Sequence, residues 1–226
     1  MDPGNAGESA VGRFYTRWAG VYDLFASAAP GISRARRRGV DALGVDPGET
    51  VAEMGCGTGA NLPHLRESVG STGTVVGVDL ARGALARARS RIERAGRENV
   101  DVVRGDATRP PLGRVDALLA TFVVGMFDDP AAVVGRWCDV VDPGGRVVLL
   151  NATRSDHPAA IPLNLGFRAF VRLGAPGRRF ARGSPAGDLE RSVTRAQEAL
   201  RDRCGWFRRE SLLGGYLTLA VGEIEG

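Results

Sequence analysis

Lysine is absent from this chain of 226 residues, and all 30 of its basic residues are arginine. The absence excludes every chemistry that needs a lysine amine, such as Schiff-base formation, pyridoxal-phosphate attachment and the phosphate clamp of a Walker A loop. It also removes the Tyr/Lys pair of short-chain dehydrogenases. A nicotinamide dehydrogenase is therefore a weak reading of the sequence.

Cysteine and long apolar runs are scarce as well. The three cysteines, Cys56, Cys138 and Cys204, are far apart and form no C-x-x-C pair, so we expect neither disulfides nor a bound metal. Residues 1–12 lack the pattern of a signal peptide, and the longest apolar run, residues 117–127, is shorter than a membrane span. We therefore expect a cytoplasmic protein without a membrane-spanning helix.

The remaining composition, 43% hydrophobic and 25% charged, is typical of one soluble globular domain. Between residues 49 and 152, short β-rich runs alternate with amphipathic helical stretches. The expected strands are residues 50–54, 74–79, 100–104, 115–122 and 146–152, and the expected helices are residues 61–69, 81–95 and 130–141. This alternation predicts an α/β fold, a Rossmann-like doubly wound sheet of five parallel strands.

The segments outside this alternation complete the predicted organisation. Asp142-Pro143-Gly144-Gly145 is expected to stop a helix and turn the chain into the fifth strand. Two strands around Gly214-Gly215 predict an antiparallel edge within residues 205–226. Residues 1–48 and 153–204 are expected to be helical, including a helix from Ser184-Pro185 to about Arg203. The four segments, residues 1–48, 49–152, 153–204 and 205–226, are expected to form one domain.

A glycine loop is the sharpest local signal. In Glu53-Met54-Gly55-Cys56-Gly57-Thr58-Gly59, a strand ends and a helix begins, so flexible backbone and unpaired helix N–H groups can approach a ligand. Asp79 ends the second strand 20 residues after Gly59, where a carboxylate can accept hydrogen bonds from ribose hydroxyls. Gly105-Asp106-Ala107 follows the third strand. These groups converge at one edge of the sheet, which predicts a nucleotide-type site.

The details of the loop favour a cofactor with a cationic amino-acid portion. Its spacing is G-x-G-x-G, not the G-x-G-x-x-G of dinucleotide folds, and Glu53 would repel a pyrophosphate. With Asp79, Gly105-Asp106-Ala107 and Asp142-Pro143-Gly144-Gly145, the loop resembles the class I S-adenosylmethionine-dependent methyltransferases. The resemblance covers about residues 48–152 and the two-strand tail.

This resemblance implies S-adenosylmethionine as the cofactor and a role for each motif. The glycine loop would hold the methionine portion, Asp79 the ribose, and Asp106 with the Ala107 amide the adenine. Thr121 and Phe122 would flank the cofactor and face the acceptor. The expected cofactor-binding residues are Tyr22, Glu53, Gly55, Cys56, Gly57, Thr58, Gly59, Asp79, Leu80, Asp106, Ala107 and Thr121. Cys56 fills a small-residue position and is not expected to react.

The sequence identifies no catalytic residue. Transfer from a sulfonium needs alignment and desolvation, and a base only when the acceptor must lose a proton. The candidates for such a base are Tyr22, Asp23, Asp156 and His157, although His157 alone is more simply a solvated loop residue. A catalytically silent protein that binds S-adenosylmethionine therefore stays an alternative.

The arginines point to an anionic partner. Arg34, Arg36, Arg37 and Arg38 lie in an acid-free stretch, and residues 157–187 hold five more arginines and no acid. In the resembled family, residues 1–48 and 153–204 would form a helical lid over the acceptor. An apolar lid with an arginine rim favours a lipophilic acceptor at an anionic membrane over a nucleic acid.

Two further stretches refine the resemblance. Residues 18–25 and 213–222 are similar to ubiquinone/menaquinone biosynthesis C-methyltransferases and to phospholipid N-methyltransferases. We therefore expect methyl transfer to a small or lipophilic acceptor, either a quinone-type ring or a phospholipid head group. An RNA methyltransferase is the alternative within enzymes, supported by the basic pI of about 9.5.

Overall fold

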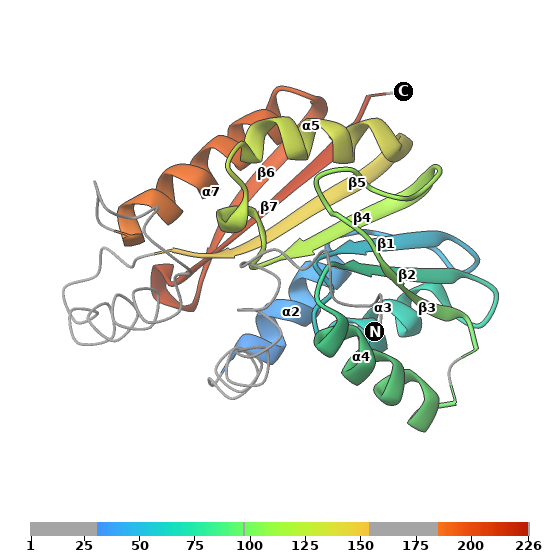
Figure 1. Ribbon diagram of the computed structural model, residues 1–226. Coiled ribbons are helices and arrows are strands. Elements are labelled where there is room, and N and C mark those ends of the chain that lie inside the picture. The colour runs from blue at the N-terminus through green and yellow to red at the C-terminus, as the bar shows by residue number, and fades with distance from the viewer. Residues whose placement is uncertain (1–30, 97, 154–184, 226) are drawn as a thin grey trace.

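A computed structural model of the chain describes residues 31–96, 98–153 and 185–225 (Figure 1). Most of the expected lid lies outside these residues, and so do the proposed cofactor contact Tyr22 and the candidate bases Tyr22, Asp23, Asp156 and His157. None of the helices in the described residues is both long enough and apolar enough to cross a membrane.

One seven-stranded sheet forms the centre of the fold (Figure 1). Its strands are β1 (Thr50–Met54), β2 (Thr74–Asp79), β3 (Val100–Arg104), β4 (Val115–Thr121), β5 (Val141–Ala152), β6 (Cys204–Leu212) and β7 (Leu217–Ile224). They lie in the order β3-β2-β1-β4-β5-β7-β6. The first five are parallel, β7 is antiparallel to β5, and β6 is antiparallel to β7. The predicted parallel sheet with an antiparallel edge is confirmed.

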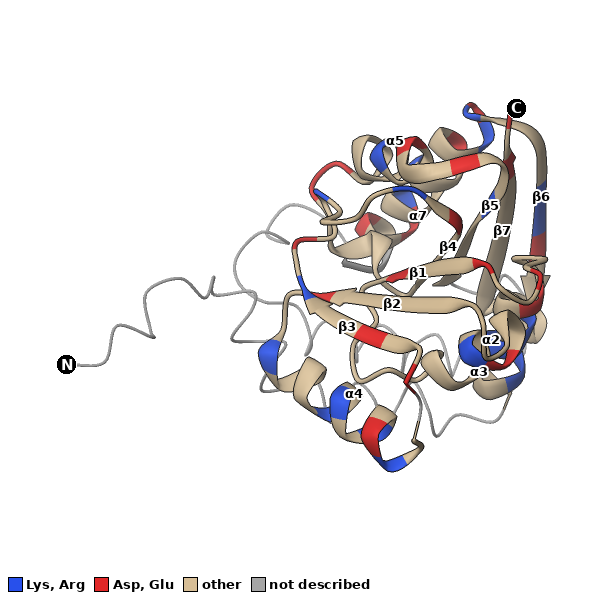
Figure 2. Ribbon diagram, turned by 90° about the vertical axis from the view of Figure 1, so that its right-hand side faces the viewer, with Lys and Arg blue, Asp and Glu red and all other residues tan. Residues whose placement is uncertain are grey.

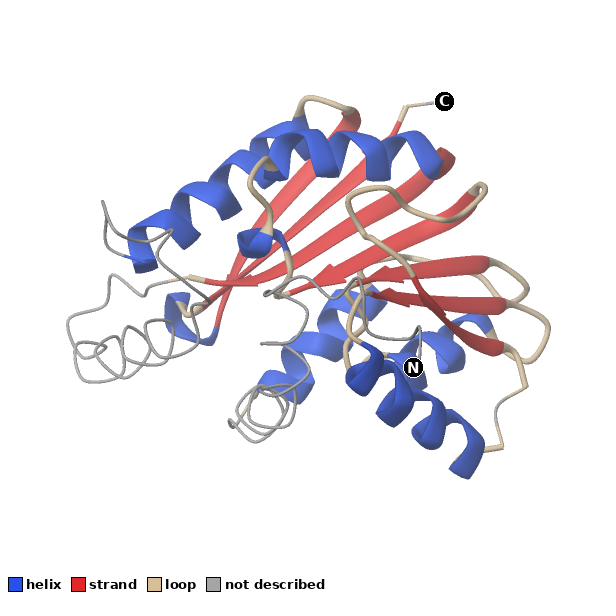
Figure 3. Cartoon of the chain, in the orientation of Figure 1, coloured by secondary structure: helices blue, strands red, loops and turns tan. Residues whose placement is uncertain are grey.

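Helices cover both faces of the sheet, as Figure 3 shows. The described helices are α2 (Ile32–Asp41), α3 (Leu62–Val69), α4 (Arg82–Arg94), α5 (Pro130–Val140) and α7 (Pro185–Arg201), with 3-10 turns η2 (Val124–Met126) and η5 (Leu213–Gly215). Alternate residues of each strand point to opposite faces, so Val51 packs in the core beneath α2, α3 and α4, while Ala52 packs beneath α5 and α7.

The Asp142–Gly145 turn differs from the expectation. Helix α5 ends at Val140, but β5 already begins at Val141, which pairs with Val115 of β4. The register then shifts, and regular pairing resumes at Arg146. The four residues therefore form an irregularity inside a longer strand, with Gly144 at a φ of 83°. Sequence patterns cannot show this, because a Pro-Gly-Gly run signals a turn and a bulge equally.

The order of the strands also indicates where a ligand-binding site is expected. β1 lies between β2 and β4, and the helices that follow β1 and β4 cover opposite faces of the sheet. In open α/β sheets, ligands bind outside the carboxyl ends of the strands at such a switch point. The glycine loop follows β1 at this position.

Candidate functional site

The three glycines of the loop differ in why a side chain would not fit at their positions or why the backbone there favours glycine. Gly55, Gly57 and Gly59 have φ values of 70°, 55° and 78°, in the left-handed region that glycine tolerates best. A Cβ on Gly55 would lie 2.7 Å from Val123 Cγ2, and one on Gly59 would lie 2.8 Å from Leu62 Cδ1. A Cβ on Gly57 would meet no described residue within 4 Å. Gly55 and Gly59 therefore permit close packing, whereas Gly57 borders open space.

Asp79 holds the loop from the end of the neighbouring strand. Its Oδ2 accepts a hydrogen bond from the Gly57 N–H at 2.8 Å, and its Oδ1 accepts one from the Ala81 N–H at 2.8 Å. Burial raises the pKa of the Asp79 carboxyl, although these N–H groups oppose the shift. Each carboxylate oxygen has a second lone pair, so further donors can still be accommodated. Leu80 follows with 45% of its surface exposed, which leaves an apolar face beside the carboxylate.

Cys56 is a packing residue. Its side chain is buried, and a Cβ on Gly77 of β2 would lie only 2.8 Å from its Sγ. Burial raises the pKa of the thiol well above its ordinary value, so little thiolate forms at neutral pH. This position agrees with the expected small-residue slot.

Asp106 and Ala107 lie after β3 in an ordered turn. Asp106 is exposed, and its Oδ1 accepts a hydrogen bond from the Thr108 N–H at 2.8 Å. The Ala107 carbonyl accepts a hydrogen bond of 2.8 Å from Nε1 of Trp137, a fully buried residue of α5. This anchor fixes the backbone next to the Asp106 carboxylate.

A buried polar network lies beneath the loop. Asn61 Nδ2 donates hydrogen bonds to Glu53 Oε1 and, at 3.0 Å, to Thr121 Oγ1. Glu53 is 1% exposed, and its Oε2 has no hydrogen-bond partner among the described residues. Burial raises the pKa of the Glu53 carboxyl to about 7, against the opposing effects of Asn61 and the positive charge of Arg36. The network joins the ends of β1 and β4 at a carboxyl group that titrates near neutrality.

Arg36 of α2 completes this network. Its Nη1 donates to Asn61 Oδ1 at 3.1 Å and to Thr121 Oγ1 at 3.2 Å. The guanidinium carbon lies 5.1 Å from the centre of the Phe122 ring, within cation–π range. Phe122 has a φ of 59°, a strained backbone for a bulky residue, and its N–H donates to the Leu150 carbonyl at 2.8 Å. Arg36 thus contacts both residues at the end of β4.

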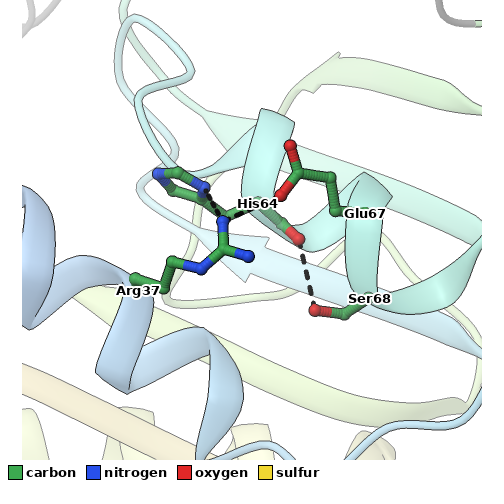
Figure 4. Close-up of polar contacts among 4 residues, drawn as sticks. All are labelled: Arg37, His64, Glu67 and Ser68. Carbon is green, nitrogen blue, oxygen red and sulfur yellow. Dashed lines mark hydrogen bonds and ion pairs between the residues drawn. The ribbon is translucent and has the colours of Figure 1, made fainter.

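Arg37 and Arg38 of α2 form ion pairs with residues of other elements. Arg37 forms an ion pair of 2.8 Å with Glu67 of α3, and the same Nη1 lies 3.2 Å from His64 Nδ1 (Figure 4). Arg38 forms two hydrogen bonds to the Glu210 carboxylate on β6. The structure therefore corrects the expectation for Arg36, which is buried. Arg37 and Arg38 fix α2 against α3 and β6, and Arg34 is exposed.

The structure brings most of the predicted set to one sheet edge, but sequence reasoning missed Arg36 and Asn61. Arg36 shares the buried stripe of α2 with Ala35, Gly39 and Val40, and that helical spacing was the available signal. Asn61 occupies the N-cap position of α3, yet its side chain makes no capping bond and turns to Glu53 instead. Of the predicted set, only Tyr22 falls outside the described residues.

The site has the features that a nucleoside with a cationic amino-acid portion requires. Among the described residues, Gly57 leaves open space where a Cβ would lie, Asp79 ends the adjacent strand, and a Glu53 oxygen is buried without a hydrogen-bond partner. A buried carboxylate oxygen of this kind favours a cationic partner. The fold and the site define a nucleoside-binding α/β protein.

Comparison with known proteins identifies the family. Residues 51–145 match the family described as "Methyltransferase domain". The chain is 35% identical over 145 residues to a phosphatidylethanolamine N-methyltransferase of Cereibacter sphaeroides, covering 63% of this chain and 68% of that relative. The chain belongs to the class I S-adenosylmethionine-dependent methyltransferases, whose cofactor is S-adenosylmethionine, and the predicted family is confirmed.

Other relatives differ in the acceptor that their names state. The chain is 34% identical over 137 residues to a nocamycin O-methyltransferase of Saccharothrix syringae, covering 60% of this chain and 48% of that protein. It is 30% identical over 118 residues to a demethylmenaquinone methyltransferase of Shouchella clausii, covering 51% and 50%. The chain thus spans about half the length of these two relatives.

One solved structure supports the fold. An S-adenosylmethionine-dependent methyltransferase from Aquifex aeolicus superposes with a TM-score of 0.65 over 92% of this chain and 98% of that one. At 18% sequence identity, this likeness concerns the arrangement of helices and strands.

Proposed function

We propose that this chain transfers a methyl group from S-adenosylmethionine to a small or lipophilic acceptor, either a quinone-type ring or a phospholipid head group. We further propose that it acts in the cytoplasm, in peripheral contact with an anionic membrane. The observation that carries the proposal is the pairing of Gly57, which borders open space, with the Asp79 carboxylate that binds its N–H. The relatives named for phospholipid and quinone substrates support the acceptor class.

The proposed cofactor contacts follow the geometry of the site. Asp79 would accept hydrogen bonds from the ribose, and the exposed side chain of Leu80 would cover one face of the adenine. Asp106, with the Ala107 amide, would bind the adenine edge from the turn that Trp137 anchors.

The methionine portion would lie along the glycine loop. Gly55, Cys56, Thr58 and Gly59 shape the backbone there, and Glu53 and Thr121 provide the polar groups beneath it. Tyr22 belongs to the proposal as a contact from the lid. Of the expected lid segments, residues 1–48 and 153–204, the helices α2 and α7 pack on the sheet as part of the core.

S-adenosylmethionine, when bound, supplies a methyl group activated by its positively charged sulfur. The work left to the protein is alignment and exclusion of water. Thr121 and Phe122 are fixed by Arg36 and by the Leu150 carbonyl, so the end of β4 would form a fixed wall between cofactor and acceptor. If the acceptor must lose a proton, the proposed bases are Tyr22, Asp23, Asp156 and His157.

Labelled methyl transfer tests the function directly. The protein and labelled donor are added to a cell extract, which is then separated into lipid, RNA and protein fractions, with Asp79→Ala as the control. We expect label in the lipid fraction with the unsubstituted protein and no label there with Asp79→Ala. Label in RNA would replace the lipophilic acceptor by the nucleic-acid alternative. A lack of transfer together with binding of S-adenosylhomocysteine would mean a silent binding protein.

A further inference from the structure

Three arginines follow one flank of α4. Arg87, Arg91 and Arg94 are spaced at i, i+4 and i+7, so they lie on the same side of the helix. With Thr58, Ala86 and Ser90 they line an open groove of about 350 Å3. Figure 2 shows the basic residues of α4 along the outer surface of the molecule. The groove begins at Thr58 of the glycine loop and extends along α4.

The three arginines carry positive charges that no described carboxylate pairs with directly. Within the described residues, none of the three forms an ion pair, in contrast to Arg37, which is paired with Glu67. The hydrogen bonds of Arg91 and Arg94 go to the backbone carbonyls of Gly59 and Ser90. The guanidinium groups therefore keep most of their donors for an external anion.

The chemistry of the groove selects its partner. Guanidinium groups bind phosphate oxygens in a planar, two-pronged geometry, and basic residues near an anionic bilayer each strengthen binding to its surface. Single-stranded nucleic acids are usually held by aromatic side chains on which bases stack, and none of the described residues that line this groove is aromatic. We propose that the α4 groove, lined by Arg87, Arg91 and Arg94, docks the protein on the phosphate groups of an anionic phospholipid bilayer.

The groove lies next to the cofactor loop. Thr58 belongs to both, and Arg91 donates to the carbonyl of Gly59 at 3.4 Å. Docking through α4 would therefore hold the loop close to the bilayer, from which a lipophilic acceptor must come. The inference rests on the proposed function in this respect, and it places the membrane contact on the described residues of the core.

Co-sedimentation with vesicles tests the groove. Vesicles of phosphatidylcholine alone are compared with vesicles that also contain phosphatidylglycerol, using the full chain and the triple variant Arg87→Gln, Arg91→Gln, Arg94→Gln. We expect the full chain to bind the anionic vesicles only, and the triple variant to bind them about 100-fold more weakly. Because Arg91 touches the loop, the double variant Arg87→Gln, Arg94→Gln is also measured, and it should show about two-thirds of that effect on a logarithmic scale, or about a 20-fold weakening.

A matched control removes the same charge elsewhere. Arg136, Arg195 and Arg209 are exposed on α5, α7 and β6, and substituting all three by glutamine changes the net charge equally. This control should retain nearly all vesicle binding. An equal loss in both triple variants would overturn the inference, because total charge alone would then explain the binding. Binding to RNA but not to vesicles, or full displacement by millimolar inorganic phosphate, would overturn it as well.

Titration with S-adenosylhomocysteine separates this inference from the proposed function. If the ligand binds and the groove substitutions leave vesicle binding unchanged, only the docking surface is wrong. If the unsubstituted chain does not bind the ligand, the proposed function fails whatever the vesicles show. Circular dichroism of each variant verifies that the fold is intact.

Discussion

Glutamine at position 53 should change how the stability of the protein depends on pH. Burial raises the pKa of the Glu53 carboxyl to about 7 from an ordinary value of 4.5. Between these values the folded state binds a proton that the unfolded state has released, so the free energy of unfolding falls as pH rises. Above pH 7 the folded protein must hold a buried carboxylate. Glu53→Gln keeps the shape of the side chain and removes this charge.

The size of the effect follows from the shift. A difference of about 2.5 pKa units corresponds to about 3 kcal/mol between the two protonation states, and most of this change falls between pH 5 and pH 8. Burial also raises the pKa of Asp79 and lowers that of His64, and these groups act in opposite directions on the pH dependence. His64 contributes equally to the two proteins, and the repulsion between Glu53 and Asp79 is lost together with the Glu53 charge, so the difference between the two proteins reports on Glu53 and that coupling.

Urea unfolding at pH 5 and pH 8 provides the measurement. The free energy of unfolding of Glu53→Gln, relative to the unsubstituted protein, should rise by about 2 kcal/mol or more between these two pH values. Parallel pH profiles for the two proteins would refute the reasoning, because Glu53 would then titrate alike in the folded and unfolded states.

Three further predictions concern the same site. Asp79→Ala should weaken binding of S-adenosylhomocysteine by at least about 1.5 kcal/mol in isothermal titration, and unchanged affinity would remove Asp79 from the site. Gly57→Ala should weaken that binding and lower the free energy of unfolding by only about 1 kcal/mol. Gly59→Ala should destabilise the fold more strongly, because its Cβ would contact Leu62 and Ala88. Equal stability of the two variants would contradict this assignment. Arg36→Met should lower the free energy of unfolding by about 2 to 3 kcal/mol and Arg36→Lys by less, which thermal unfolding can compare; a stability unchanged in both variants would mean that the hydrogen bonds of Arg36 contribute nothing.

The sequence predicted the sheet well because the signals for parallel strands are local. Short β-rich runs between amphipathic helices gave β1, β2 and β3 with their observed bounds, and the tail gave the antiparallel edge. It failed at Asp142–Gly145, where the same residues suit a turn or a strand irregularity, and pairing with Val115 decides between them. Tertiary contact determines such a choice, and sequence spacing does not encode it.

The residues of the candidate site could be predicted where they lie in the glycine loop after β1 or at the end of β2. Gly55, Gly57, Gly59 and Asp79 could be found from spacing, because a strand followed by a helix fixes where each residue lies. Arg36 could not be assigned in this way, since its partners Asn61 and Thr121 are 25 and 85 positions away along the chain. Its location among other arginines suggested an exposed rim, and only packing reveals that it is buried.

The position of Arg36 limits how this protein can be divided or recombined. The residues that match the methyltransferase family begin at Val51, so α2 and its buried cation lie ahead of that segment. A fragment that starts at the matched segment would keep Glu53 and Asn61 in the core and lose the positive charge that balances them. An N-terminal segment exchanged with a relative, for example to change the acceptor, would have to bring a replacement cation to the same depth. The N-terminal segment and the buried network beneath the glycine loop are thus linked through one side chain.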